Sequence, residues 1–344
     1  MKITNKITSM KPKVSILCIT YNHGAYIRDA LDGFVMQKTN FPFEVLIHDD
    51  ASTDDTADII REYAAKYPDI IKPILQTENQ WSRGVSISKV FQWPRISGEY
   101  VAMNEGDDYW TDPYKLQKQV DFLDAHPDYS VCFHPVRVTW DNGKYPDSIF
   151  PSKKCRFYKT TLELSDLLKN NFIQTNSVMY RWRRDCINIY PDNILPGDWY
   201  QHLLHAQVGK IGFIPDIMSV YRRNDGGIWT GAYETDDWFK KNTLRVLNFY
   251  KNAQRQFNHN FHNAMASVAS GGICAFLRAG DMDTISKIRE MYPDIYVAAT
   301  SRINNQDFNH FKSKYQKYNK ITTTLICIVC GLIILWGVLC CTRI

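Results

Sequence analysis

Residues 14–27 read VSILCITYNHGAYI, a nearly unbroken apolar run that gives way to polar residues. A strand buried on both faces of a sheet has such a run, whereas a half-exposed strand alternates apolar and polar residues. The run ends at Thr20, Tyr21 and Asn22, and polar residues followed by a glycine are typical of a loop. The stretch therefore predicts a buried parallel strand over 14–19 with a loop at its carboxyl end.

Helical and strand patterns alternate after this first strand. Apolar residues at helical spacing cover 27–35, and a second strand is predicted over 43–47. Capping residues open a second helical pattern over 51–67, and further strands are predicted over 71–77 and 99–104. This alternation predicts an open α/β sheet.

The rest of the chain is predicted to be more helical. A helix is expected over 114–126, followed by one strand over 129–140. The region 150–195 is irregular. Helices are expected over 236–318, and the segment 269–293 is typical of a helical hairpin.

Polar residues follow three of the predicted strands, at 20–22, 48–50 and 105–108. Ligands of open α/β sheets bind at the carboxyl ends of the strands, so we expect these groups to converge. The chain carries neither a G-x-G-x-x-G nor a G-x-x-x-x-G-K-[ST] fingerprint. The sequence therefore predicts a nucleotide-type sheet without the dinucleotide or P-loop signature.

The third polar group contains Glu105, Asp107 and Asp108, within the segment GEYVAMNEGDDYW at 98–110. Such a cluster has two interpretations: a solvated acidic start of a helix, or a site for a hard divalent cation. A divalent cation would bridge the carboxylates to phosphates, and the acidic end of the second strand favours this interpretation.

The composition excludes several classes of protein. The chain has 344 residues, 44% of them hydrophobic, which favours two domains over one. The net charge is only +5, whereas a nucleic-acid-binding protein usually has a concentrated basic face, so no nucleic-acid partner is expected. Five of the nine cysteines are scattered without metal-ligand spacing, which predicts reduced cysteines in the cytosol.

The two ends of the chain differ in character. Residues 1–13 have no apolar core of a signal peptide, whereas 321–341 are 21 residues without a charge. A helix of that length spans the roughly 30 Å hydrocarbon core of a bilayer, and a buried core helix is usually shorter and amphipathic. Four lysines lie in 312–320 and only Arg343 follows the apolar run, which predicts a C-terminal tail anchor with the rest of the chain at the cytoplasmic face.

Three motifs, at 14–27, 44–56 and 98–110, together with Gly-Asp-Trp at 197–199, resemble those of family 2 glycosyltransferases with the GT-A fold. The resemblance covers roughly residues 12–230 and is strongest to bacterial enzymes that build surface polysaccharides. It implies a GT-A domain, and the patterns described above add a helical region and a transmembrane anchor after it. The expected bounds are 12–235 (a nucleotide-sugar half over 12–125 and an acceptor half over 126–235), 236–318 and 321–341.

The resemblance implies roles for residues at the first two strand ends. Thr20, Tyr21 and Asn22 are expected to line the nucleotide pocket of a nucleoside-diphosphate sugar. Asp50 is expected to accept hydrogen bonds from the nucleobase, and Asp49 to support that loop.

The resemblance places Glu105-Gly106-Asp107 where the family carries its Asp-x-Asp motif. Asp107 is expected to contact ribose or metal, and Asp108 to ligate Mg²⁺ or Mn²⁺ on the diphosphate. Glu105 replaces the usual Asp, and its role as a direct or an indirect contact stays open.

Asp198 matches the position of the family's catalytic base, and Trp199 is expected beside the acceptor sugar. The alternative for Asp198 is an N-cap of the following helix. Arg222 and Arg223 are expected either to pair with the pyrophosphate or to form a surface arginine pair. Asn224 stands where related enzymes often carry a histidine.

The sequence therefore predicts an inverting, metal-dependent glycosyltransferase. Its donor would be a nucleoside-diphosphate sugar and its acceptor a lipid-linked saccharide at the cytoplasmic membrane face. The alternatives are transfer to polyprenyl phosphate, an inactive binding or scaffold protein, and a nucleotidyltransferase. The presence of Glu105, Asp107, Asp108 and Asp198 argues against an inactive scaffold.

Overall fold

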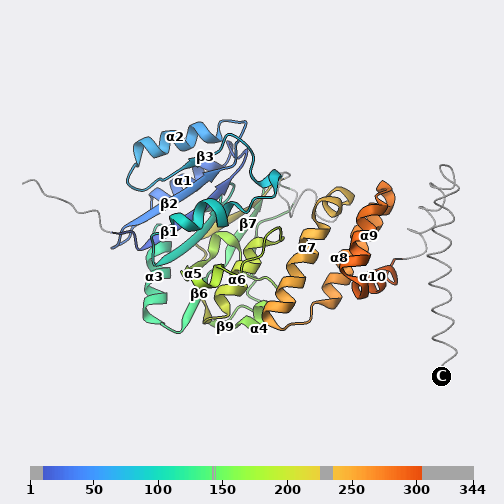
Figure 1. Ribbon diagram of the computed structural model, residues 1–344. Coiled ribbons are helices and arrows are strands. Elements are labelled where there is room, and N and C mark those ends of the chain that lie inside the picture. Colours follow the sequence, from blue (N-terminus) through green and yellow to red (C-terminus); the bar gives the residue numbers. More distant parts are fainter. Residues whose placement is uncertain (1–10, 142, 144, 225–234, 304–344) are drawn as a thin grey trace, which may run out of the picture. The chain divides into compact units, whose positions relative to one another are not determined.

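The computed structural model describes residues 11–141, 143, 145–224 and 235–303. The chain divides into two compact units (Figure 1). The first unit comprises Met1–Gly231 with Arg255–His259, and the second comprises Ala232–Gln254 with Asn260–Ile344.

The first unit is built on an eight-stranded mixed sheet (Figure 1). Strand β1 (Val14–Thr20) lies between β2 (Phe43–Asp49) and β4 (Tyr100–Glu105) and is parallel to both. Strand β10 (Met179–Arg181) is antiparallel to β4 and makes the sheet mixed, so the predicted open α/β sheet is confirmed. The order is β3-β2-β1-β4-β10-β6-β11-β9, where β3 is Ile74–Leu75, β6 Tyr129–Phe133, β9 Thr161–Leu162 and β11 Lys210–Phe213.

A second, four-stranded sheet corrects the prediction of one strand over 129–140. That segment forms two strands, β6 in the main sheet and β7 (Val136–Trp140) in the second. The chain leaves the main sheet at Pro135, which has no backbone N–H to continue the ladder. The order of the second sheet is β5-β12-β7-β8, where β5 is Tyr109–Trp110, β12 Ser219–Arg223 and β8 Ser148–Phe150.

Two predicted elements are shorter than the sequence indicates. The helix expected over 51–67 begins only at Thr56, because residues 52 and 53 hydrogen-bond to the neighbouring loops. The strand expected over 71–77 reduces to two residues, β3. The helices of the first unit are α1 (Ile27–Val35), α2 (Thr56–Lys66), α3 (Lys115–Ala125), α4 (Leu164–Leu167), α5 (Arg184–Ile187) and α6 (Gly197–Ala206).

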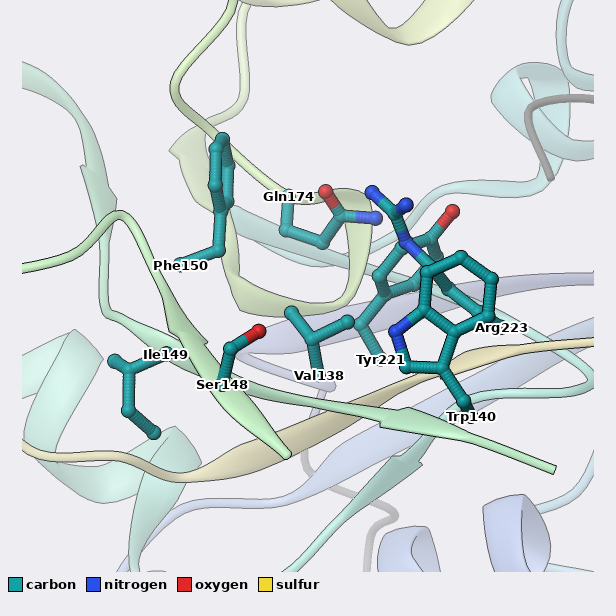
Figure 2. Close-up of a pocket in the computed structure, with 8 residues that line it drawn as sticks. All are labelled: Val138, Trp140, Ser148, Ile149, Phe150, Gln174, Tyr221 and Arg223. Atoms are coloured by element: carbon teal, nitrogen blue, oxygen red, sulfur yellow. The ribbon is translucent and has the colours of Figure 1, made fainter. Parts of the chain in front are cut away.

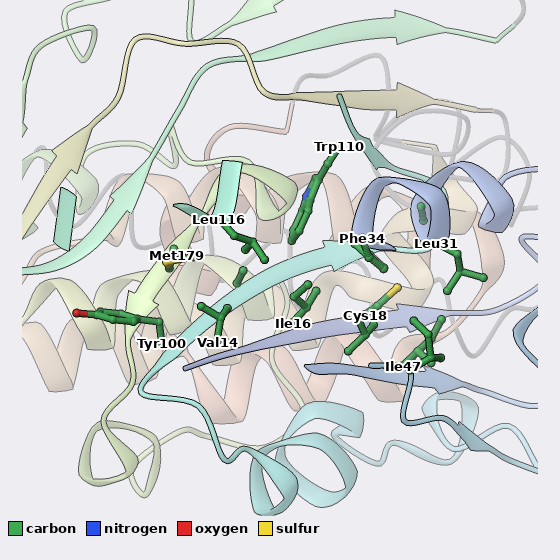
Figure 3. Close-up of a cluster of buried hydrophobic side chains, with 14 of the residues drawn as sticks. Val14, Ile16, Cys18, Leu31, Phe34, Ile47, Tyr100, Trp110, Leu116 and Met179 are labelled. Carbon is green, nitrogen blue, oxygen red and sulfur yellow. The ribbon is translucent and has the colours of Figure 1, made fainter. Parts of the chain in front are cut away.

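An apolar core joins β1, β2 and β4 to helices α1 and α3 (Figure 3). Phe34 of α1 packs edge to face on Trp110, with ring centroids 4.9 Å apart. A Cβ atom at Gly33 would lie 2.9 Å from the backbone nitrogen of Trp110, so only glycine lets α1 approach β5 this closely. Each such buried side chain contributes roughly 1.5–3 kcal/mol. The core thus fixes Trp110, which lies two residues after the acidic segment 105–108.

The second unit is helical within the described residues. It contains α7 (Asp236–Phe257), α8 (His262–Ala279), α9 (Met282–Met291) and α10 (Pro293–Thr300). The predicted hairpin over 269–293 is confirmed, since α8 and α9 are joined at Gly280 with a φ of 77°. Between residues 11 and 303, no described helix combines the length and apolarity needed to cross a membrane. The predicted transmembrane segment, 321–341, lies outside the described residues.

Lys115 is an ionisable residue inside the core of the first unit. Its side chain is fully buried at the start of α3, and Nζ donates a 2.7 Å hydrogen bond to Gln119 Oε1. Nζ also lies 4.0 Å from the ring centroid of Trp110. Burial lowers the pKa of Lys115 to about 7, because the charged form loses its hydration.

Replacing Lys115 with methionine should change how stability depends on pH. The unfolded chain keeps this proton up to the ordinary pKa of 10.5, whereas the folded chain releases it near pH 7. Between these values the unfolded state binds more protons, so the free energy of unfolding rises with pH, by at most about 1.4 kcal/mol per pH unit. Lys115→Met should remove this rise in denaturant titrations of the full chain between pH 7 and 10. Lys66→Met, which removes an exposed helical lysine, is the control; equal slopes in both variants would contradict the assignment.

Candidate active site

The carboxyl ends of β1, β2 and β4 lie side by side. In the register of the sheet, Thr20 is opposite Asp49, and Ile19 is opposite Glu105. The loops that follow these strands therefore start from the same edge, as the sequence predicts. The edge brings together polar residues that are separated by up to about ninety positions in the chain.

The first two loops are tied to each other by Asn22. Its backbone is left-handed, with a φ of 54°, and its N–H donates to Ser52 Oγ over 2.8 Å. The backbone N–H of Thr53 donates in return to Asn22 Oδ1 over 2.8 Å. Asp49 Oδ2 accepts from the backbone N–H of Ser52 over 3.2 Å. Tyr21, next to Asn22 in the first loop, points away from these hydrogen bonds and is 44% exposed.

Asp50 is buried and anchors a different loop. Its two carboxylate oxygens accept from the backbone N–H groups of Gln80 (2.8 Å) and Trp81 (3.0 Å), which begin the 3₁₀ turn Trp81–Arg83. His48 Nε2 lies 3.6 Å from Asp50, and burial lowers the pKa of this histidine. The expected contact between Asp50 and a nucleobase stays a prediction, because the carboxylate is used here to hold the loop.

The acidic segment at the end of β4 is held in a tight turn. Asn104 Nδ2 donates to the carbonyl oxygen of Asp108 over 2.9 Å. A Cβ atom at Gly106 would collide with the side chain of Thr20, so glycine lets the turn pack against the end of β1. Glu105 is exposed at the mouth of the site, whereas Asp108 is buried beneath it.

The two aspartates of this turn have different partners. Asp108 Oδ1 accepts from the backbone N–H of Arg222 over 2.8 Å, while the buried Oδ2 has no hydrogen-bond partner among the residues that the structure describes. Asp107 Oδ2 accepts from Asn224 Nδ2 over 2.8 Å and lies 3.9 Å from His23 Nε2. Asn224 therefore contacts an acidic residue of the turn directly.

The crowded carboxylates are electrostatically unfavourable as they stand. Burial, and then the neighbouring charges of Asp107 and Glu105, raise the pKa of Asp108. The surrounding protein displaces much of the water near the accessible Glu105, and together with Asp107 and Asp198 this raises its pKa to about 8. A bound cation would offset this repulsion.

The carboxylate oxygens of the acidic turn suit a divalent cation that takes its remaining ligands from a bound substrate and from water. Across the described residues no group of three or more His, Cys, Asp or Glu side chains is placed to hold a metal ion. Mg²⁺ in nucleotide-dependent enzymes usually takes only one or two carboxylates from the protein, and its other ligands are phosphate oxygens and water. Asp107 and the unpartnered Oδ2 of Asp108 are the carboxylate oxygens that would meet this requirement.

Arg222 is held against this cluster. Its guanidinium donates to Asp29 Oδ2 over 2.7 Å and to the carbonyl oxygen of Asp107 over 2.9 Å. It also lies between the rings of Tyr26 and Tyr109, each centroid 4.8 Å away. The side chain is only 11% exposed, so it is not a surface arginine, and its expected pyrophosphate contact stays a prediction.

Asp198 lies on the second residue of α6, and the alternative of an N-cap is wrong because Pro196 occupies that position. Asp198 Oδ2 accepts from Thr175 Oγ1 over 3.3 Å. Trp110, two residues after Asp108, donates from Nε1 to the carbonyl oxygen of Asn176 over 3.0 Å, which connects the acidic turn to the segment that holds Asp198. Burial raises the pKa of Asp198, and it lowers that of the neighbouring His202 to about 3, which keeps this histidine neutral.

The sequence prediction missed the segment that supports Asp198. Thr175 belongs to a 3₁₀ turn (Thr175–Ser177), and Asn176 in that turn donates from Nδ2 to the carbonyl oxygen of Val220 over 2.8 Å. The polar stretch Gln174–Ser177 within apolar sequence was the available signal. Trp199, expected beside an acceptor sugar, donates from Nε1 to the carbonyl oxygen of Leu167 over 3.0 Å.

Comparisons with solved structures agree with this architecture. The structure resembles S. aureus TarS (residues 1–349) in complex with UDP-GlcNAc, with a TM-score of 0.50 at 18% identity, covering 89% of this chain and 93% of that one. It resembles the mannosyltransferase PcManGT from Pyrobaculum calidifontis, in complex with GDP-Man and Mn²⁺, with a TM-score of 0.50 at 16% identity, covering 86% and 87%. At these identities the likeness establishes a shared fold, the GT-A type.

Sequence relatives establish the family. An uncharacterized protein of Mycobacterium tuberculosis is 51% identical over 220 residues, which are 64% of this chain and 61% of that protein. This chain therefore spans about three-fifths of the length of that relative. TuaG of Bacillus subtilis, named for teichuronic acid biosynthesis, is 34% identical over 257 residues, 71% of this chain and 93% of TuaG. Residues 15–186 match the family Glycosyl transferase family 2, and the chain belongs to this family.

Proposed function

We propose that this protein is an inverting, metal-dependent glycosyltransferase of surface polysaccharide synthesis. Its donor is a nucleoside-diphosphate sugar, and its acceptor is a lipid-linked saccharide at the cytoplasmic membrane face. Family membership and the names of relatives such as TuaG support this proposal. Structures that share its fold contain UDP-GlcNAc, or GDP-Man with Mn²⁺.

One observation carries the proposal: a lone carboxylate adjoins a carboxylate cluster. Asp198 accepts from Thr175, and the adjacent Asn176 accepts from Trp110, two residues after Asp108. Among the described residues, nothing hydrogen-bonds to the buried Oδ2 of Asp108. An inverting, metal-dependent transfer of a sugar from a diphosphate uses both elements. The cluster suits a cation on the leaving diphosphate, and the separate carboxylate suits the acceptor hydroxyl.

In the proposed reaction, Asp198 acts on the acceptor hydroxyl and Thr175 positions Asp198. Asp198 takes the proton of the acceptor hydroxyl as its oxygen attacks the sugar C1 from the face opposite the diphosphate. The bond between C1 and the diphosphate oxygen breaks, and the nucleoside diphosphate leaves with the bonding electrons. The cation, when bound, stabilises this leaving group as a Lewis acid. Thr175 keeps the Asp198 carboxylate oriented, through its 3.3 Å hydrogen bond.

The proposed membrane location fits the chemistry of the acceptor. A lipid-linked saccharide is confined to the bilayer surface, so an anchor raises the local concentration of enzyme near its substrate. The apolar segment 321–341, which lies outside the described residues, supplies the proposed anchor. The lysines of 312–320 suit an anionic lipid surface.

A donor screen tests the proposal as a whole. The full chain, purified in detergent, is incubated with UDP- and GDP-sugars, with and without Mn²⁺, and release of the nucleoside diphosphate is measured. We expect binding and slow hydrolysis of one class of donor that depend on the metal. Failure of every nucleotide-sugar to bind or react would overturn the proposed function.

Replacing Asp198 with asparagine should lower transfer by roughly 10²–10⁴-fold, the usual contribution of a general base. The amide keeps the shape of the side chain but cannot accept the proton, so binding of the nucleotide should be unchanged. Wild-type transfer should also fall at acidic pH, since Asp198 must be deprotonated and burial raises its pKa. The control is Asp58→Asn, which changes a carboxylate that is 81% exposed on α2. Transfer at the wild-type rate by Asp198→Asn would refute the assignment.

Replacing Asp108 with asparagine should abolish stabilisation by the metal. In the wild type, saturating Mn²⁺ with the preferred nucleotide should raise the melting temperature by about 5 °C or more. Asp108→Asn keeps an oxygen for the Arg222 N–H but removes the negative charge, so Mn²⁺ should add little to the effect of the nucleotide. Melting curves of the full chain with nucleotide alone and with nucleotide plus Mn²⁺ provide the measurement. An undiminished Mn²⁺ effect in this variant would exclude Asp108 as a ligand.

A further inference from the structure

The second sheet carries a pocket that has no role in the scheme above (Figure 2). In its register Tyr221 of β12 is opposite Val138 of β7, and Arg223 is opposite Trp140. Alternate residues of a strand point to the same face, so these four side chains share one face of the sheet. They enclose a cavity of about 240 Å³ together with Ser148, Ile149, Phe150 and Gln174.

Arg223 gives this pocket a positive charge. Its Nε is buried and has no hydrogen-bond partner among the described residues, and its guanidinium lies 4.9 Å from the ring centroid of Trp140. Among the described residues no carboxylate forms an ion pair with Arg223. Its neighbour Arg222 is different, since it donates to Asp29 and to the carbonyl of Asp107. A buried cationic donor without an acceptor is costly, and an anionic ligand would supply the missing acceptor.

The pocket adjoins the carboxylates of the candidate active site. Gln174 at its wall directly precedes Thr175, whose hydroxyl donates to Asp198. Tyr221 is close enough to Asp108 and Glu105 for their charges to contribute to its raised pKa. A group bound here would therefore lie on the side of the proposed base, away from the strand ends that hold the nucleotide loops.

The lining of the pocket matches a charged sugar. Trp140, Tyr221 and Phe150 offer apolar surface to the C–H faces of a sugar ring, and Gln174 and Ser148 offer hydrogen bonds. The volume of about 240 Å³ is below the roughly 300–1,000 Å³ of sites for drug-sized ligands, which favours a single sugar unit. An arginine fork suits a carboxylate or a phosphate better than a neutral hydroxyl.

We propose that the pocket around Arg223 and Trp140 binds an anionic group, a carboxylate or a phosphate, carried by a sugar unit of the acceptor. The inference rests on the proposed function for the identity of the ligand as an acceptor. It adds a specificity determinant: Arg223 selects acceptors that carry a negative charge beside the position of Asp198.

The test compares three probes on the full chain in detergent, without donor: methyl β-D-glucoside, its 6-phosphate and methyl β-D-glucuronide. Binding is measured by saturation-transfer NMR and by the fluorescence of tryptophan. At least one anionic probe should bind about tenfold or more tightly than the neutral glucoside, because a charge-assisted hydrogen bond is gained. Whether the uronate or the phosphate is preferred identifies the source of the charge.

Arg223→Gln should abolish the preference for the anionic probe, and Arg223→Lys should retain part of it, since the charge remains without the fork. The matched control is Arg137→Gln, on β7 but three residues before Trp140, the residue opposite Arg223, with a side chain that is 56% exposed. This variant should keep the preference. Melting temperatures of all variants report whether each is folded.

Several results would overturn the inference. They are equal binding of the neutral and anionic probes, no binding of either anionic probe at millimolar concentration, and a preference that survives in folded Arg223→Gln. Binding of UDP and GDP is measured in parallel. If the wild type bound neither UDP nor GDP, that result would count against the proposed function and not against the pocket. The comparison of probes tests the pocket itself.

Discussion

The hydrogen bond from the backbone N–H of Arg222 to Asp108 Oδ1 joins the two sheets at the place where negative charge is most crowded. Asp108 follows the end of β4 in the main sheet, and Arg222 belongs to β12 in the second. The same carboxylate is buried, and its second oxygen has no partner within the described part of the chain, so its position is fixed while its charge is only partly compensated there. The geometry of the candidate active site depends on this contact, because it sets where the acidic turn meets the second sheet.

Partial compensation of charge explains how the turn is kept ready for a ligand. Asn224 and Arg222 hold Asp107 and Asp108 in place, yet the raised pKa of Asp108 shows that the ionised form remains unfavourable without a further cation. If arginines neutralised these carboxylates fully, a bound metal ion would gain no further electrostatic stabilisation from them. The arrangement therefore favours binding of a divalent cation together with the phosphates that complete its coordination.

The strand ends could be predicted because their signal is local. The apolar run before Thr20 and the acidic segment from Glu105 to Asp108 mark the ends of buried strands, and parallel topology then brings them together. The partners of Asp50 could not be predicted in this way. Its carboxylate accepts hydrogen bonds from the backbone N–H groups of Gln80 and Trp81. Because almost every residue type has such an N–H group, no sequence pattern predicts this contact.

Local signals also failed where the chain changes sheets. The segment 129–140 has one continuous strand pattern, but β6 and β7 belong to different sheets. Pro135 was the available signal of the break, and the prediction of a single strand did not use it. The support of Asp198 by Thr175 depends on how two segments 23 positions apart in the chain pack together, and spacing in the sequence carries no information about that distance.

The adjacent arginines of β12 show how one strand serves two environments. Because side chains alternate along a strand, Arg222 faces the acidic turn while Arg223 faces the pocket beside Trp140. The pairing of Val220 with Tyr109 on one side and with Arg137 on the other fixes this register. A slip of one residue would exchange the two faces and place each arginine in the environment of the other. The short strand β5, held by the core through Trp110, therefore determines which arginine neutralises the carboxylates and which stays available to a ligand.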